Sequence, residues 1–226
     1  MTTFTGWPAD ATAFLAEIEA DNTREFWELH GHRHAAAVQA PMRALAAELE
    51  PEFGPIRVLR AYRNRRFRPA APPYRTDTGG VAHSPGGATL SVVLSATAFS
   101  TAVGHWEFDS GQLRRFRAAV DGPAGVELAG LLGGHLVDRS RSLRVTPRGF
   151  RGDHPHIDLL RLRGLQVVTS SPVGEWLATR EPLEQVRAAW RAATPVVGWL
   201  DTHVGPADPV PVRPRPVPEQ QPEAAG

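Results

Sequence analysis

The stretch ATLSVVLSA, from Ala88 to Ala96, decides the class of fold, because its run of β-branched and apolar residues predicts a strand. Upstream of it, residues 56–62 (IRVLRAY) alternate in part between polar and apolar and predict another strand. Downstream, residues 99–108 (FSTAVGHWEF) and 166–170 (QVVTS) predict two more. Linkers rich in Pro and Gly separate the first of these segments, as is common between antiparallel strands. We therefore expect a central, mainly antiparallel sheet.

Helical patterns precede the strands. Residues 7–20 (WPADATAFLAEIEA) place four apolar side chains on one helix face, and these are Ala11, Phe14, Leu15 and Ile18. Asn22 followed by Glu25 predicts the cap of a second helix and its capping-box partner. Pro41 predicts the start, or a kink, of a third helix.

Helical patterns also follow the strands, over residues 110–120, 126–136 and 182–200, the last with a kink expected at Pro195. Helices first, then a block of strands, then helices again favour an α+β fold over alternating βαβ units. From Gly205 onward the chain is Pro-rich and has too few large apolar residues to form a core. We expect a single α+β domain over residues 1–204 and a disordered Pro-rich tail over residues 205–226.

The composition narrows the possible chemistry. The chain has 226 residues, a net charge of +1 and no cysteine, and all 25 of its basic residues are arginine. The lack of lysine excludes Schiff-base catalysis, and the lack of cysteine excludes disulfides, thiolate metal ligands and cysteine nucleophiles. A net charge of +1 gives the molecule as a whole no polycationic attraction to nucleic acid.

Targeting and cofactor signals do not occur in the sequence. The N-terminus lacks a basic region followed by an apolar run, and no segment has 18 uninterrupted apolar residues. We therefore expect a cytoplasmic protein without a membrane partner. The GxGxxG, P-loop and GxSxG patterns do not occur either, and we expect no cofactor. The sequence does not indicate an oligomeric state.

An arginine-rich block forms the strongest candidate site. It contains Arg57, Arg60, Arg63, Arg65, Arg66, Arg68 and Arg75, and the two tyrosines of the protein, Tyr62 and Tyr74, lie within it. So many guanidinium groups repel one another unless solvent, carboxylates or a bound anion compensate. A guanidinium pairs with phosphate or carboxylate through two hydrogen bonds, and Tyr can donate another. Because side chains alternate along a strand, not all seven can line one pocket. The alternative is a solvated, salt-bridged edge strand and loop.

The segment PRGFRGDHPHIDLLRLRG, residues 147–164, has metal-ligand types at close spacing, namely Asp153, His154, His156 and Asp158. Pro155 stiffens the chain between the two histidines and opposes their convergence, so we expect no metal here. A pair at helical spacing, His30 and His34, has no HExxH pattern beside it, and we expect these to be surface or interhelical polar residues.

The same segment has the features of a helix start. Pro155 suits the first helical turn, Asp153 or His154 can supply the cap, and Gly164 can end the helix. Arg148 and Arg151 precede it, so an anion site at the helix N-terminus stays open as an alternative.

Three motifs together resemble the DUF2461 family. Residues 4–27 resemble its F-x-G-F, F-L and N-N-x-R-E-W-F pattern, and residues 60–76 resemble R-x-Y-R-D-x-R-F followed by K-D-K and P-Y-K-T. Residues 147–164 resemble P-R-G-F-x-x-D-H-P-x-x-x-L-L-R. The blocks fall in the expected order, and the resemblance covers about residues 4–200. It implies no established activity.

The chain departs from this family pattern at several positions. Asn64 replaces the aspartate of the second motif, and Pro69, Ala70 and Ala71 replace its K-D-K stretch. The N-terminal aromatic pair reads Phe26-Trp27, the inverse of Trp-Phe. If the charged stretch carries chemistry in the family, this chain lacks part of it.

These observations lead to several hypotheses of function. The first is binding of an anionic or phosphorylated small molecule in a pocket lined by Arg60, Tyr62, Arg63, Arg66 and Tyr74, with Arg148, Asp153 and His154 as further candidates. An enzyme would use His154 as its general base. A nucleic-acid-binding module would place the arginines on phosphates and stack Trp or Tyr on bases. A structural or interaction protein would pair its arginines internally.

Overall fold

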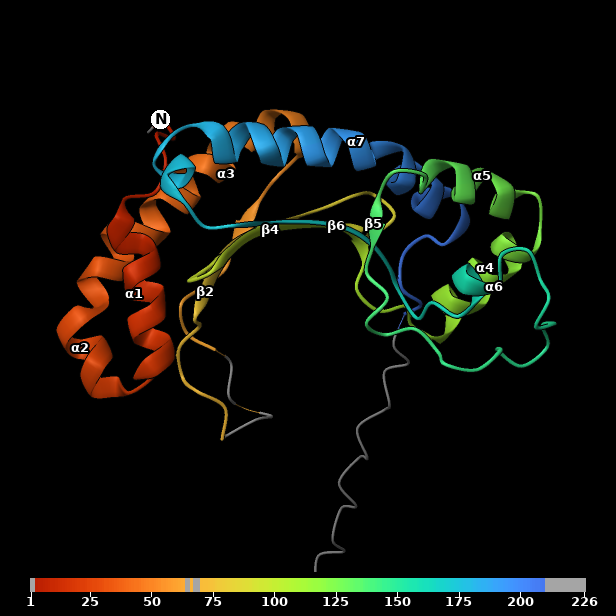
Figure 1. Ribbon diagram of the computed structural model, residues 1–226, viewed down its shortest axis with the longest axis horizontal. Coiled ribbons are helices and arrows are strands. Elements are labelled where there is room, and N and C mark those ends of the chain that lie inside the picture. The colour runs from red at the N-terminus through yellow and green to blue at the C-terminus, as the bar shows by residue number, and fades with distance from the viewer. Residues whose placement is uncertain (1–2, 64–65, 67–69, 210–226) are drawn as a thin grey trace, which may run out of the picture.

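The computed structural model describes residues 3–63, 66 and 70–209, and Figure 1 shows their arrangement. The strands are β1 (Arg57–Val58), β2 (Asp77–His83), β3 (Thr89–Ser95), β4 (Ala98–His105), β5 (Leu136–Val137) and β6 (Leu165–Pro172). The α-helices are α1 (Ala9–Ala20), α2 (Arg24–Arg33), α3 (Ala40–Phe53), α4 (Ser110–Asp121), α5 (Ala124–Leu131), α6 (Ile157–Leu160) and α7 (Glu181–His203). A π-helix (His34–Gln39) joins α2 to α3, and a 3-10 helix (Glu175–Ala178) precedes α7.

The strands of the described residues form one sheet in the order β1-β2-β3-β4-β6-β5. Every neighbouring pair is antiparallel. Burial alternates along β3, where Leu90, Val92 and Leu94 are buried and the residues between them are half-buried. This alternation is the pattern of a sheet with one face packed on a core. The expected α+β fold with a central antiparallel sheet is therefore confirmed.

Helices cover one face of this sheet. Figure 1 shows α3 and α7 over the sheet, α1 and α2 beyond one end, and α4, α5 and α6 beyond the other. The main core includes Met42 and Leu45 of α3, Trp190 of α7, and Val92 and Val103 of the sheet. No helix of the described residues lies over the middle of the opposite face in Figure 1, and we call this face the open face.

A second core lies under α4, α5 and the C-terminal half of α7, and we call this part of the molecule the second lobe. It is built around Phe116, Leu128, Leu160 and Trp199. The chain beyond α7 stays attached to this lobe, because the Arg115 guanidinium donates to the carbonyl oxygens of Val204 and Pro206 and to the Asp208 carboxylate. The contacts of the domain thus extend past the expected boundary at residue 205, and the remainder of the predicted tail, residues 210–226, lies outside the described residues.

The edge of the sheet differs from the expected strand over residues 56–62. Only Arg57–Val58 joins the ladder, and the chain then continues beside β2 and the residues that precede it through separate hydrogen bonds. The Leu59 N–H donates to the Gly79 carbonyl at 2.8 Å, and the Arg75 N–H donates to the Ala61 carbonyl at 2.7 Å. The sequence does not predict β2, because two glycines and an aspartate give it a low strand propensity. Pairing with strands on both sides compensates for that propensity.

Two helix predictions need correction. The helix expected over residues 126–136 ends at Leu131, because Gly134 adopts a φ of 90° and turns the chain into β5. The cap of α2 is Thr23 rather than Asn22, since the Thr23 hydroxyl accepts a hydrogen bond from the Phe26 N–H at 3.2 Å.

The prolines within the helical segments are accommodated without ending them. Pro41 lies in the first turn of α3 and has no N–H to donate. The π-helix precedes it, and there the Ala40 N–H donates to the Ala35 carbonyl, five residues back. Residues 24–53 therefore form one continuous helical stretch, and α7 likewise continues through Pro195.

Candidate functional site

An aromatic cluster joins α2 to the β1 edge of the sheet. The rings of Trp27 and Tyr74 stack at a centroid distance of 4.4 Å and an interplanar angle of 8°. Tyr62 lies against both rings, at 5.4 Å from Trp27 and 5.1 Å from Tyr74. Tyr74 is only 4% exposed, whereas Tyr62 is 60% exposed. The buried Tyr74 therefore supports this cluster from behind, and the exposed Tyr62 forms its surface.

The Asn22 side chain fixes the position of Tyr74. Its amide NH₂ donates to the Tyr74 carbonyl at 3.2 Å, and its carbonyl oxygen accepts from the Tyr74 N–H at 3.0 Å. The amide thus pairs with both backbone groups of Tyr74 as a neighbouring strand would. The same NH₂ also bonds the Ile18 carbonyl, which ties the site to α1.

A groove of about 610 Å³ follows the chain along this edge, and we call it the edge groove. Its lining consists of Arg57, Val58, Leu59, Arg60, Tyr62, Arg63 and Arg75. The volume is in the range of natural ligand sites. Three residues of the predicted pocket, Arg60, Tyr62 and Arg63, are therefore brought together.

The arginines of the edge groove differ in their partners. Arg75 forms an ion pair with Asp77, with an N–O distance of 2.6 Å. Among the described residues, the guanidinium groups of Arg57, Arg60 and Arg63 form neither an ion pair nor a hydrogen bond. Internal pairing thus accounts for Arg75 and not for these three, whose positive charge faces the groove and solvent.

Burial sets the protonation states behind the groove. It raises the pKa of Tyr74, with a smaller contribution from the neighbouring Tyr62, so the phenol stays protonated at neutral pH. His34 is buried between the rings of Phe14 and Trp27, and this burial lowers the pKa of its imidazole. The support of the groove is therefore uncharged, and the charge lies on its arginines.

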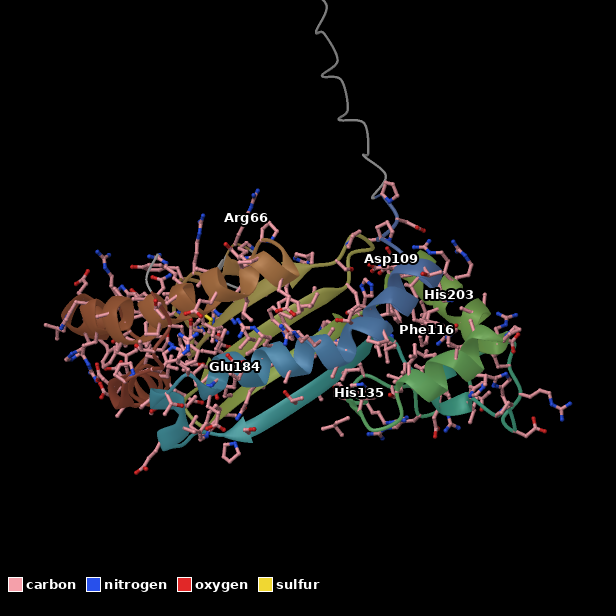
Figure 2. All side chains as sticks on the ribbon, turned by 90° about the horizontal axis from the view of Figure 1, so that it is seen from above. Arg66, Asp109, Phe116, His135, Glu184 and His203 are labelled. Atoms are coloured by element: carbon pink, nitrogen blue, oxygen red, sulfur yellow. The ribbon has the colours of Figure 1, made fainter. Side chains whose placement is uncertain are left out.

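Other residues of the predicted pocket do not line the groove. Tyr74 lies behind it, as described above, and Arg66 is not among its lining residues. Figure 2 shows Arg66 on the α3 side of the molecule, away from His135 at the opposite edge of the sheet. Arg65 and Arg68 lie outside the described residues, as do Asn64 and Pro69.

Arg148, Asp153 and His154 lie in the second lobe and not beside the edge groove. They belong to the connection between β5 and α6, and β5 is the edge strand opposite β1. Asp153 pairs with Arg151 at 2.8 Å, and the described contacts of Arg148 include no ion pair. The structure therefore separates these three residues from Arg60, Tyr62 and Arg63.

His154 has both ring nitrogens engaged. Its Nδ1 accepts from the His156 N–H at 3.0 Å, and its Nε2 lies 3.2 Å from an Asp121 carboxylate oxygen. This arrangement fixes the turn that precedes α6. Neither Asp153 nor His154 caps that helix, whose N-cap is His156 without a side-chain bond. In the described part of the chain, no three metal-ligating side chains come together.

The sequence does not predict that three residues, Asn22, Trp27 and His34, support the groove. Asn22 and Trp27 lie in the first family-like motif, and that membership was the signal that could have linked them to the second motif. Their contacts with Tyr74 span about fifty residues of sequence, so local pattern alone does not reveal them.

The fold and the groove define this chain as an α+β protein with an arginine-lined groove at one edge of an antiparallel sheet. Residues 10–199 match the family described as "Conserved hypothetical protein (DUF2461)". The chain therefore belongs to the DUF2461 family, as its motifs predict. No curated protein and no solved structure matches it. None of the described helices is long and apolar enough to cross a membrane.

Proposed function

We propose that the protein binds an anionic or phosphorylated small molecule in the edge groove. The observation that carries the proposal is the gathering of Arg57, Arg60 and Arg63 around one groove without carboxylate partners among the described residues. Guanidinium groups held close together repel one another, and a bound anion removes that repulsion. Their planar donor groups suit phosphate and carboxylate, which accept two parallel hydrogen bonds.

Tyr62 adds a second kind of contact to the groove. Its exposed ring rests on the Trp27–Tyr74 stack, so its orientation is supported from behind. An aromatic ring beside guanidinium groups suits a ligand that has a planar group as well as an anion.

A cytoplasmic location stays a prediction from the sequence.

Isothermal titration with inorganic pyrophosphate tests the proposal. We expect saturable binding by the wild type and at least a tenfold loss of affinity in the double variant Arg60→Ala/Arg63→Ala. The matched control is Arg148→Ala, which removes an exposed arginine in the second lobe and should bind like the wild type. Equal affinities for all three proteins, or no binding by the wild type, would contradict an anion site in the groove.

The nucleic-acid alternative is supported by the exposed Tyr62 ring, which could stack on a base. The slope of log affinity against log salt distinguishes the two ligands. A single strand that contacts several phosphates loses affinity steeply with added salt, whereas one small anion loses less. Tighter binding of oligothymidylate than of pyrophosphate, with a steep slope that falls in Arg63→Ala, would favour the nucleic acid.

A further inference from the structure

The edge groove lies along a strand edge rather than around a single point. Its lining includes the consecutive residues 57–60, followed by Tyr62 and Arg63. Side chains of an extended chain alternate between two faces, so this lining draws on both faces of the same strand. Seven extended residues span about 20 Å. The groove thus has the length of a short peptide segment.

Some backbone groups along this edge have no hydrogen-bond partner among the described residues. The hydrogen bonds to the β2 side use the N–H groups of Leu59 and Arg63 and the carbonyl of Ala61. Because backbone groups alternate in direction along an antiparallel strand, those of Arg60 and Tyr62 point away from β2. No hydrogen bond with another described residue uses the backbone of Arg60 or Tyr62. An added strand would find donors and acceptors here.

Charge selects the kind of strand that could bind. By the alternation of an extended chain, Arg57 and Arg63 fall on one face and Arg60 on the other, so we infer that both faces of the edge are cationic. Leu59 extends toward the open face, since it would contact a side chain added at Gly79. A second copy of this edge would bring arginines against arginines, which opposes pairing between identical chains.

We propose that the edge groove binds an acidic, extended segment of a partner protein as an added β-strand. The inference rests on the proposed function for its recognition of carboxylates by arginine. It adds main-chain hydrogen bonds from Arg60 and Tyr62, which supply affinity, while acidic side chains of the segment supply specificity. The two contributions can be removed separately.

A peptide of alternating Glu and Thr, with seven residues and blocked ends, is the probe. Two N-methylated forms are compared, one methylated at every Thr and the other at every Glu. Both keep the full negative charge, but in an extended strand only one set of N–H groups faces the protein. We expect one form to bind like the parent and the other at least tenfold more weakly. Equal affinities of the two forms, at either level, would overturn the inference.

The protein offers a matched pair of variants for the same test. Arg60→Ala and Arg60→Pro lose the same charge, and only Pro also removes the outward N–H; Pro is tolerated on a strand edge. Compared with Arg60→Ala, the Pro variant should bind the peptide about tenfold more weakly and pyrophosphate equally well. The melting temperatures of the two variants verify that both fold, and Val58→Pro beside Val58→Ala repeats the comparison if Arg60→Pro does not.

The outcomes separate the two proposals. Pyrophosphate binding that requires Arg63, together with equal peptide binding by the Ala and Pro variants, would leave the anion site intact and overturn the added strand. Failure of both pyrophosphate and peptide to bind would overturn both proposals. A dimer that dissociates in Arg60→Pro but not in Arg60→Ala would show that a second copy occupies the edge, and it would overturn the acidic partner.

Discussion

Two regions of the molecule use arginine in opposite ways. Between α3 and α7, three arginines have carboxylate partners: Arg180 pairs with Glu48, Arg187 with Glu52 and Glu184, and Arg191 with Glu52. In the edge groove, the side chains of Arg57, Arg60 and Arg63 have no such partner among the described residues. Both regions use arginine, but only the α3–α7 region places carboxylates beside it.

The difference distinguishes arginines that stabilise the fold through ion pairs from arginines whose charge could bind a ligand. Arg180 donates to the Phe4 carbonyl as well as to Glu48, and Glu48 accepts from the Phe4 N–H, so this pair fastens the N-terminal segment to α3 and α7. The guanidinium lowers the pKa of Glu48 through its hydrogen bond to the carboxylate, so the pair favours the charged form of Glu48. The side chains of the groove arginines form no such contacts among the described residues, and we propose that they bind a ligand.

The largest expected effect concerns the support of the groove. Trp27→Ala removes the ring that stacks on Tyr74 and contacts His34, and we expect a loss of about 3 kcal/mol in the free energy of unfolding. Tyr62→Ala removes an exposed ring and should cost less than about 1 kcal/mol. Urea denaturation of both variants gives the two values. Similar losses would mean that Tyr62 is also part of the support.

A smaller effect separates the two arginine regions directly. Glu48→Ala leaves the Phe4 N–H without its acceptor and removes the carboxylate partner of Arg180, which keeps only its bond to the Phe4 carbonyl. We expect a loss of about 1–3 kcal/mol in the free energy of unfolding. Arg63→Ala should change it by no more than about 0.5 kcal/mol, because no described partner is left unpaired. A loss in Arg63→Ala as large as in Glu48→Ala would contradict the contrast between the regions.

We expect the protein to lose stability in mild acid, because buried histidines such as His34 behind the groove are uncharged in the folded state. Burial lowers the pKa of His34, and it also lowers that of His105, which lies in β4 near the second core. Below an unfolded pKa of about 6.5, the unfolded state binds protons that the folded state does not, so stability present above pH 6.5 is lost as the pH falls toward the folded pKa values.

Denaturant midpoints between pH 7.5 and 5.5 measure this loss. Replacing His34 with Phe should reduce the pH dependence in that window, and His105→Phe should do the same for the second core. A slope unchanged in both variants would show that other groups titrate. The window stays above the range in which carboxylates such as Glu48 take up protons.

The smallest expected effect is that of salt. Added sodium chloride screens the repulsion among the groove arginines and also the attraction within the exposed pairs of the α3–α7 region. In Arg57→Ala/Arg63→Ala most of the repulsion is already gone, so moderate salt should stabilise the wild type more than this variant. Melting temperatures at 0.05 and 0.5 M salt compare the two. The opposite order would mean that the groove arginines are paired in solution.

The sequence predicts those parts of the fold that have a clear local period. β3, β4 and α1 follow from alternation or from one apolar face, whereas β2 depends on pairing partners on both sides. The π-helix lies within a longer helical stretch, and helical periodicity does not predict its hydrogen bond to the residue five positions back. Local propensity contains neither kind of information.

The candidate site could be predicted only in part. The arginine block and Tyr62 are visible as composition, but which arginines have partners depends on long-range contacts such as that of Arg180 with Glu48, 132 residues apart. The sequence adds Arg148 and His154 to the predicted pocket because residues 147–164 have the features of an anion site at a helix N-terminus. The strand order, which places β1 and β5 at opposite edges, separates them.

The most direct test of the contrast observes the arginines themselves. Two-dimensional NMR spectra of the arginine Nε–Hε groups, assigned by single Arg→Lys variants, can be recorded during titration with pyrophosphate. We predict saturable shifts for Arg57, Arg60 and Arg63, with unchanged signals for Arg180 and Arg191, which are bound to Glu48 and Glu52. Equal shifts in both groups, or no shift in the groove arginines, would contradict the account.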